Sequence, residues 1–222
     1  MTVLMQNIYL MSLLISALLS LKAFRLSWPL AYKLLSVLLF VALATEILAI
    51  LCDEYLYQFK GWNYFTSNYW IMTFSIAPQY LLYMAVYYEV LHNKRIKKRI
   101  IWVAIIFTFF VILNVSFWQG INAINSLSHL FADIIMLILV YVYFEQLRTQ
   151  KKIVVLARQP MVWISIGVFI YHLLNVPFLY CLEFLFNSYP MLSNSVLQVY
   201  HILIFLSYTF FIKAFLCPQP QK

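Results

Sequence analysis

Long apolar stretches dominate this sequence and constrain what it can fold into. Each of seven stretches is long enough to cross a hydrocarbon layer of about 30 Å, which takes about 20 helical residues. They cover approximately residues 3–21, 28–51, 69–91, 100–118, 126–144, 161–180 and 194–215. The sequence therefore predicts an all-α, polytopic integral membrane protein in which residues 1–222 form a single seven-helix membrane domain.

Cationic side chains lie on alternate sides of these stretches. Fourteen of the fifteen Lys and Arg residues lie in or beside the first, third and fifth connectors, or at the C-terminal end of the chain. Lys60 is the exception, in the second connector. Because cationic connectors stay in the cytoplasm, we expect the N-terminus outside and the C-terminus in the cytoplasm.

Composition supports the membrane assignment and excludes one class of partner. The chain is 65% hydrophobic and only 10% charged, values that a soluble domain rarely shows. Its net charge of +8 is accounted for by cationic anchors beside anionic lipid headgroups. We therefore expect membrane lipids as partners and no nucleic acid. Aromatic residues near the predicted helix ends, Tyr87 among them, are interpreted as interfacial anchors.

Polar and ionisable residues within the predicted helices are the candidates for function. His129 and Asp133 stand four residues apart, which places them on one face of the fifth helix. An unpaired carboxylate at membrane depth costs several kcal/mol, so Glu46 and Asp133 should face the bundle interior and find partners. With the predicted orientation, the group lies mainly in the outer half. The predicted ligand-binding residues are Glu46, Gln79, His129, Asp133, His172, Asn175 and His201.

Three interpretations of this polar group remain open. It could be a hydrogen-bond network that fixes helix packing, or a small-molecule pocket with convergent polar groups. It could also be a zinc site, with ligands drawn from His129, Asp133, His172 and His201, which would make the protein a metal-dependent intramembrane hydrolase. No cofactor is predicted outright, and zinc is kept as the alternative.

Known catalytic patterns are missing from the sequence. Seven-helix zinc hydrolases related to alkaline ceramidases and progestin receptors need His-x-x-x-His on the last helix, but Phe205 stands four residues after His201. Attachment of retinal needs a lysine near the middle of that helix, whereas Lys213 lies at its cytoplasmic end. No Gly-rich phosphate loop or Gly-x-Ser-x-Gly elbow is present. The sequence therefore favours a role other than catalysis.

Two cysteines lie on the predicted outer side. Cys52 and Cys181 stand at the outer ends of the second and sixth helices, where a disulfide between them could form. Cysteines at helix ends also pack as small apolar residues, and their spacing in sequence does not choose between the two roles.

Several short segments carry a resemblance. They are Thr45-Glu46-Ile47-Leu48, Asn63-Tyr64-Phe65-Thr66, Asn114-Val115-Ser116-Phe117-Trp118-Gln119-Gly120, Asn122-Ala123-Ile124-Asn125-Ser126 and Gln159-Pro160-Met161-Val162-Trp163-Ile164. Together they resemble a group of uncharacterised bacterial seven-helix membrane proteins of similar length, some of which accompany sensor histidine kinases. The resemblance implies the bacterial inner (cytoplasmic) membrane and a link to sensing, and it supplies no catalytic residue.

These observations favour a membrane-embedded sensor or signalling component that binds a small or membrane-derived ligand in a polar cavity of the outer half. Its output would pass through the basic residues of 94–99 and 148–158 to a cytoplasmic or membrane signalling partner. The alternatives are the metal-dependent hydrolase and a structural subunit of a larger membrane complex.

Overall fold

The computed structural model describes residues 2–54, 69–121, 125–149, 156–188 and 190–218, and this part of the chain is helical without strands. Its helices are α1 (Thr2–Ser20), α2 (Lys22–Arg25), α3 (Leu30–Glu54), α4 (Tyr69–Val90), α5 (Lys94–Leu113), α6 (Ser126–Thr149), α7 (Pro160–Ser188) and α8 (Pro190–Leu216). A π-helical turn, Asn114–Trp118, continues α5, and a 3-10 turn, Leu156–Arg158, precedes α7.

A helix occupies each of the seven predicted ranges, and several helices begin or end some residues outside them. The helix α5 begins six residues before residue 100, because the Asn93 side chain caps it by accepting a hydrogen bond from the Arg95 backbone N–H (2.9 Å). The helix α7 continues through Pro177 to Ser188, beyond the predicted end at residue 180. Apolar length locates the part of a helix that suits lipid, whereas capping and polar end residues determine where the helix stops.

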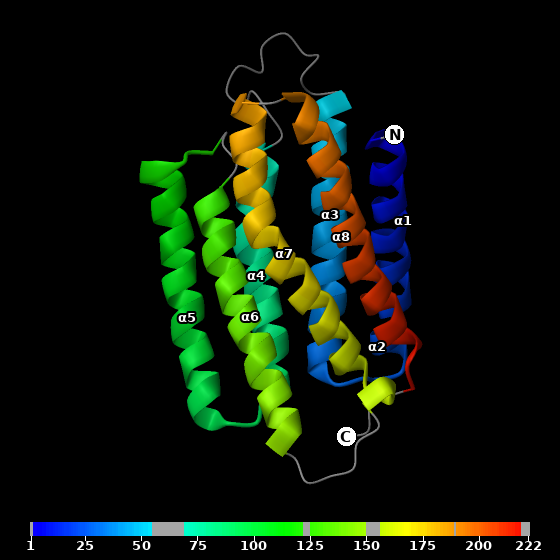
Figure 1. Cartoon of the computed structure of the whole chain (residues 1–222). Coiled ribbons are helices and arrows are strands. Elements are labelled where there is room, and N and C mark those ends of the chain that lie inside the picture. The colour runs from blue at the N-terminus through cyan, green and yellow to red at the C-terminus, as the bar shows by residue number, and fades with distance from the viewer. Residues whose placement is uncertain (1, 55–68, 122–124, 150–155, 189, 219–222) are drawn as a thin grey trace.

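The seven long helices lie side by side in one bundle (Figure 1). The helix α8 packs between α1 and α7, α3 packs against α4, and α6 packs against α7. Small residues allow close approach: the Ser207 hydroxyl donates to the Gly167 carbonyl oxygen (2.7 Å) between α8 and α7. The interior is filled by large side chains, including Trp28, Leu35, Tyr87, Met136 and Phe215.

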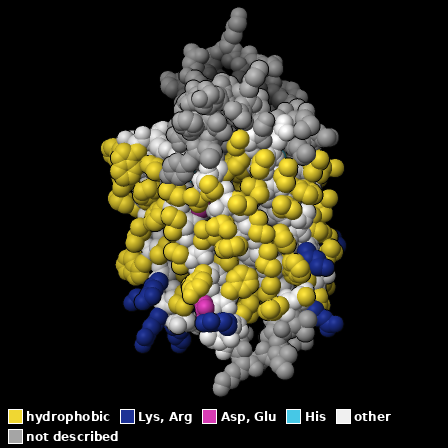
Figure 2. Space-filling view, in the orientation of Figure 1, with side chains coloured by type: hydrophobic (Ala, Val, Ile, Leu, Met, Phe, Trp, Pro, Cys, Tyr) yellow, Lys and Arg dark blue, Asp and Glu magenta, His cyan; other side chains and the backbone are white. Residues whose placement is uncertain are grey.

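One end of the bundle is basic, and we call it the basic end. Figure 2 shows Lys and Arg side chains gathered there, below a broad surface of apolar side chains. Lys22 Nζ donates to the Phe215 carbonyl oxygen (3.2 Å), and Lys97 Nζ lies 4.7 Å from the Tyr88 ring centroid. The N-terminus lies at the opposite end of the bundle (Figure 1). The alternation of charge along the sequence thus corresponds to two chemically different ends.

Six helices in the described part of the chain are long and apolar enough to cross a membrane, which indicates a multi-pass membrane protein. They lie within α1 and α2, α3, α5 with its π-helical turn, α6, α7 and α8. The helix α4 has 22 residues and is long enough, but five of them are tyrosine, which lowers its mean hydropathy.

Candidate functional site

A cavity of about 470 Å³ opens between α1, α3, α4, α6, α7 and α8. Five of the seven predicted site residues line it: Glu46, Gln79, His129, His172 and His201. The other two, Asp133 and Asn175, are bonded to each other behind the cavity wall. The structure therefore gathers the predicted residues around one space, although they come from five different helices.

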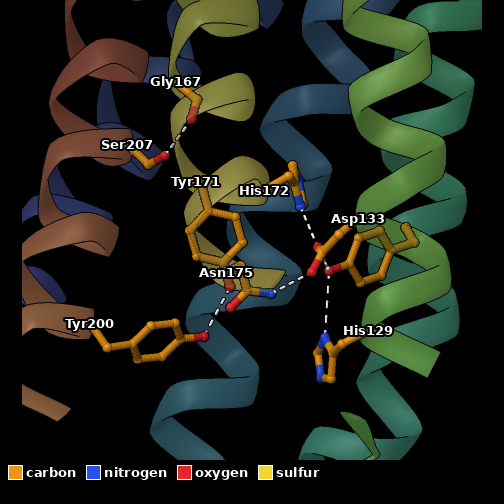
Figure 3. A network of polar contacts seen from close by, with 9 residues as sticks. His129, Asp133, Gly167, Tyr171, His172, Asn175, Tyr200 and Ser207 are labelled. Carbon is orange, nitrogen blue, oxygen red and sulfur yellow. Dashed lines mark hydrogen bonds and ion pairs between the residues drawn. The ribbon is translucent and has the colours of Figure 1, made fainter. Parts of the chain in front are cut away.

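Asp133 is the centre of the buried part of this site. Its Oδ1 accepts a hydrogen bond from the Tyr80 hydroxyl (3.0 Å) and lies 2.6 Å from His172 Nδ1. Its Oδ2 accepts from Asn175 Nδ2 (2.8 Å). Figure 3 shows His172 and Asn175 on α7 directed toward Asp133 on α6. Three donors thus compensate for burying this carboxylate, whose side chain is wholly inaccessible to solvent.

The spacing of residues along two helices positions this group. His172 and Asn175 stand three residues apart on α7, so both face α6, and His129 stands one turn before Asp133. The Tyr80 hydroxyl also lies 3.4 Å from His129 Nδ1. Tyr80 therefore connects α4 to His129 and Asp133 of α6.

Glu46 forms a second group on the other side of the cavity. Its Oε2 accepts a hydrogen bond from the Tyr9 hydroxyl (3.0 Å), and the Tyr9 ring stacks on His201 with centroids 4.9 Å apart. Gln79 Nε2 donates to the hydroxyl of Thr45, the residue before Glu46 (3.4 Å). The helices α1, α3, α4 and α8 meet here.

Two imidazole nitrogens at the cavity have no hydrogen-bond partner among the described residues. They are His172 Nε2 and His201 Nδ1. Both residues line the cavity, and His172 is only 1% exposed. A buried polar atom left unbonded costs about 1–3 kcal/mol, so each of these nitrogens would be stabilised by any hydrogen-bonding group that reached it.

Tyrosine side chains are the part of the site that the sequence analysis missed. Seven of them line the cavity: Tyr9, Tyr69, Tyr80, Tyr83, Tyr171, Tyr200 and Tyr208. The interfacial interpretation was also wrong for Tyr87, which is fully buried and donates to the Ser165 hydroxyl (3.1 Å). The spacing of these tyrosines in the sequence indicates a shared helix face, since Tyr80, Tyr83 and Tyr87 follow one face of α4 at steps of three and four.

A further polar cluster closes the junction of α5 and α6. Asn114 Nδ2 donates to Gln119 Oε1 and to the Ser128 hydroxyl, both at 2.8 Å. Asn125 Nδ2 donates to the Thr73 hydroxyl (2.6 Å), and Asn125 and Thr73 both line the cavity. Gly120 adopts a φ of +76°, which only glycine adopts without strain. This cluster joins the π-helical turn after α5 to the start of α6.

The geometry does not favour the zinc hypothesis. Within the described residues, no three His, Cys, Asp or Glu side chains are grouped as a metal site requires. Asp133 is engaged by Tyr80, His172 and Asn175, while His201 stacks on Tyr9. The metal-dependent hydrolase therefore stays an untested prediction.

The predicted disulfide also stays a prediction. Cys52 is buried near the N-terminal end of α4, against Ile71. The side chain of Cys181 lies outside the described residues, so its distance from Cys52 is not defined.

Comparisons with family models, curated proteins and solved structures return no match to this chain. The resemblance to bacterial seven-helix proteins therefore stays a prediction, and the functional argument depends on the site itself.

Proposed function

We propose that this protein is a sensor or signalling component of the bacterial inner membrane that binds a small or membrane-derived ligand in the cavity between Glu46 and His172. In this proposal α4 is the seventh span, the N-terminus is outside, and the basic end lies in the cytoplasm. The cavity extends from Tyr69 at the start of α4 past the middle of the bundle to Val168 and Phe211, and in the proposed orientation its Tyr69 end faces outside.

The observation that carries the proposal is the cavity of about 470 Å³ that is lined by Glu46, Gln79 and His172. A network that served only to pack helices would satisfy its polar atoms within the protein. Here His172 Nδ1 is held by Asp133, but Nε2 of the same ring has no hydrogen-bond partner among the described residues, so this network is not fully satisfied within the protein. The cavity volume also falls within the range of about 300–1,000 Å³ that is typical of small-molecule sites.

The basic end supports the proposed orientation in the membrane and is the proposed binding site for a signalling partner. Lys and Arg side chains at cytoplasmic helix ends hold a membrane protein in one direction. The same side chains, on the segment Lys94 to Arg99 and at Arg148 and Arg158, offer positive charge to an acidic cytoplasmic partner. A shift of α7 on ligand binding would be transmitted to the basic end along the helix itself, since α7 begins there at Pro160.

Accessibility of the cavity tests the proposal against a sealed packing network. We expect Gln79→Cys, in a protein whose three native cysteines are replaced by alanine, to react with a water-soluble methanethiosulfonate reagent. Ser165→Cys is the matched control, because Ser165 is fully buried and bonded to Tyr87 away from the cavity. Reaction at position 79 alone supports an open site, and no reaction at either position would contradict it.

A further inference from the structure

The charges around the cavity are unbalanced on the Glu46 side. None of the described Lys or Arg side chains lines the cavity. Described cations such as Lys22, Lys97 and Lys213 lie instead at the basic end. Since a carboxylate within a membrane protein is normally paired with a cation or serves as the counter-ion of a ligand, Glu46 requires an explanation.

Glu46 differs from Asp133 in how its oxygens are used. Asp133 accepts three hydrogen bonds and faces the imidazole of His172. Glu46 accepts one side-chain hydrogen bond, from Tyr9, among the described residues. A carboxylate offers about four acceptor positions, so Glu46 keeps capacity for further donors while lining the cavity.

Tyrosine rings line the cavity that Glu46 also lines. Tyr9 is bonded to it, and Tyr200 and Tyr208 line the same cavity from α8. The face of an aromatic ring carries partial negative charge and attracts an ammonium group, by about 0.5–2 kcal/mol for each contact. Carboxylate and ring faces together form the surroundings that favour an organic cation over a neutral or anionic molecule.

We propose that the ligand is an organic cation whose ammonium group lies against Glu46 and the tyrosine rings, with an uncharged body in the remaining cavity toward His172. This inference rests on the proposed function, because it requires the cavity to admit a ligand. It adds the chemical class of that ligand and assigns Glu46 as its counter-ion.

Two reagents of similar size and opposite charge test this proposal. Gln79→Cys, in the cysteine-free protein, is treated with 2-(trimethylammonium)ethyl methanethiosulfonate or with 2-sulfonatoethyl methanethiosulfonate. Each rate is divided by the rate with a free thiol in solution. We expect the cationic reagent to react about tenfold faster, because a cleft of one charge sign concentrates opposite ions. In the same protein, Glu46→Gln should bring the ratio near one, whereas Glu89→Gln, an exposed carboxylate on the groove between α4 and α5, should leave it unchanged.

Equal rates, or a faster anionic reagent, would overturn the cation inference and leave the open cavity standing. No reaction with either reagent would instead contradict the proposed function.

A second measurement does not depend on the folding of a Glu46 variant. The reporter is the reaction of Gln79→Cys with uncharged methyl methanethiosulfonate. Phenethylamine, a cation, should slow this reaction more than neutral 2-phenylethanol or anionic phenylacetate does. Equal protection by all three compounds would also overturn the inference.

Discussion

Asp133 shows how one carboxylate can be held inside a membrane protein. It joins α4, α6 and α7, because its three hydrogen-bond donors come from Tyr80, His172 and Asn175. Removing the acceptor would leave His172 Nδ1 and Asn175 Nδ2 buried without a partner and would leave Tyr80 only the longer contact with His129 Nδ1 (3.4 Å). The position therefore contributes to folding as well as to the orientation of His172 at the cavity.

We predict that Asp133→Ala lowers the free energy of unfolding by at least about 2 kcal/mol, since each buried donor left unbonded costs about 1–3 kcal/mol. Thermal unfolding in detergent measures the effect. Glu145→Ala is the control: Glu145 pairs with exposed Arg148 (2.9 Å), and such surface pairs contribute about 0–1 kcal/mol. Equal losses in the two variants would show that the Asp133 network adds no specific stability.

The sequence identified the ionisable residues of the site, because a carboxylate or imidazole within an apolar stretch is costly and must have a partner. It did not identify the partners. Tyr9 and Tyr80 are of a residue type that also anchors helix ends, so their type alone does not separate a cavity lining from an interface. The rotation of α6 and α7 about their axes decides which histidine contacts Asp133. That rotation is set by the packing of the whole bundle, so the contact with His172 could not be read from residue spacing within one helix.

At the scale of helices, the contact of α7 with α8 depends on a glycine. A Cβ added to Gly167 would lie 3.0 Å from Phe210 Cβ and 3.1 Å from the Ser207 carbonyl oxygen. Both contacts are closer than ordinary van der Waals distances, so the two helices would have to separate. The absence of a side chain at this position permits their close packing.

We predict that Gly167→Ala destabilises the protein by about 1–3 kcal/mol through overpacking. The sign is informative, because a helical Gly→Ala change without a steric conflict stabilises by roughly 0.5–1 kcal/mol. The unfolding midpoint of the purified variant provides the measurement. A higher midpoint than that of the wild type would mean that α7 and α8 do not approach as closely as described.

Helix positions were predictable from apolar length, but local irregularities were not. The early start of α5 depends on a hydrogen bond that the Asn93 side chain accepts from the Arg95 backbone N–H. The π-helical turn after α5 is held by Gln119, whose backbone N–H donates to the Asn114 carbonyl oxygen (2.9 Å). Such features arise from individual side-chain and backbone contacts, which an average over a long apolar window does not register.

At the scale of the whole molecule, the number of spans determines where the termini lie. Among the described residues, six helices satisfy the length and hydropathy expected of a span, and α4 would be the seventh. An odd number of spans places the termini on opposite sides of the membrane, whereas six would place them on the same side. The position of the termini therefore decides whether tyrosine-rich α4 crosses.

We predict that a green fluorescent protein fused to the C-terminus is fluorescent in the cytoplasm and that an epitope tag at the N-terminus is accessible from outside in spheroplasts. The basic end provides the physical reason, since its Lys and Arg side chains should remain cytoplasmic. A tag at the N-terminus that becomes accessible only after the membrane is permeabilised would contradict the seven-span arrangement.

The most direct test of a ligand cavity in the outer half is the side from which Gln79→Cys can be modified. The cysteine-free variant would be treated with the membrane-impermeant cationic methanethiosulfonate in right-side-out and in inverted membrane vesicles. We predict modification in the right-side-out vesicles and little in the inverted ones, since in the proposed orientation the Tyr69 end of the cavity faces outside. Modification only in inverted vesicles, or in neither preparation, would contradict the account.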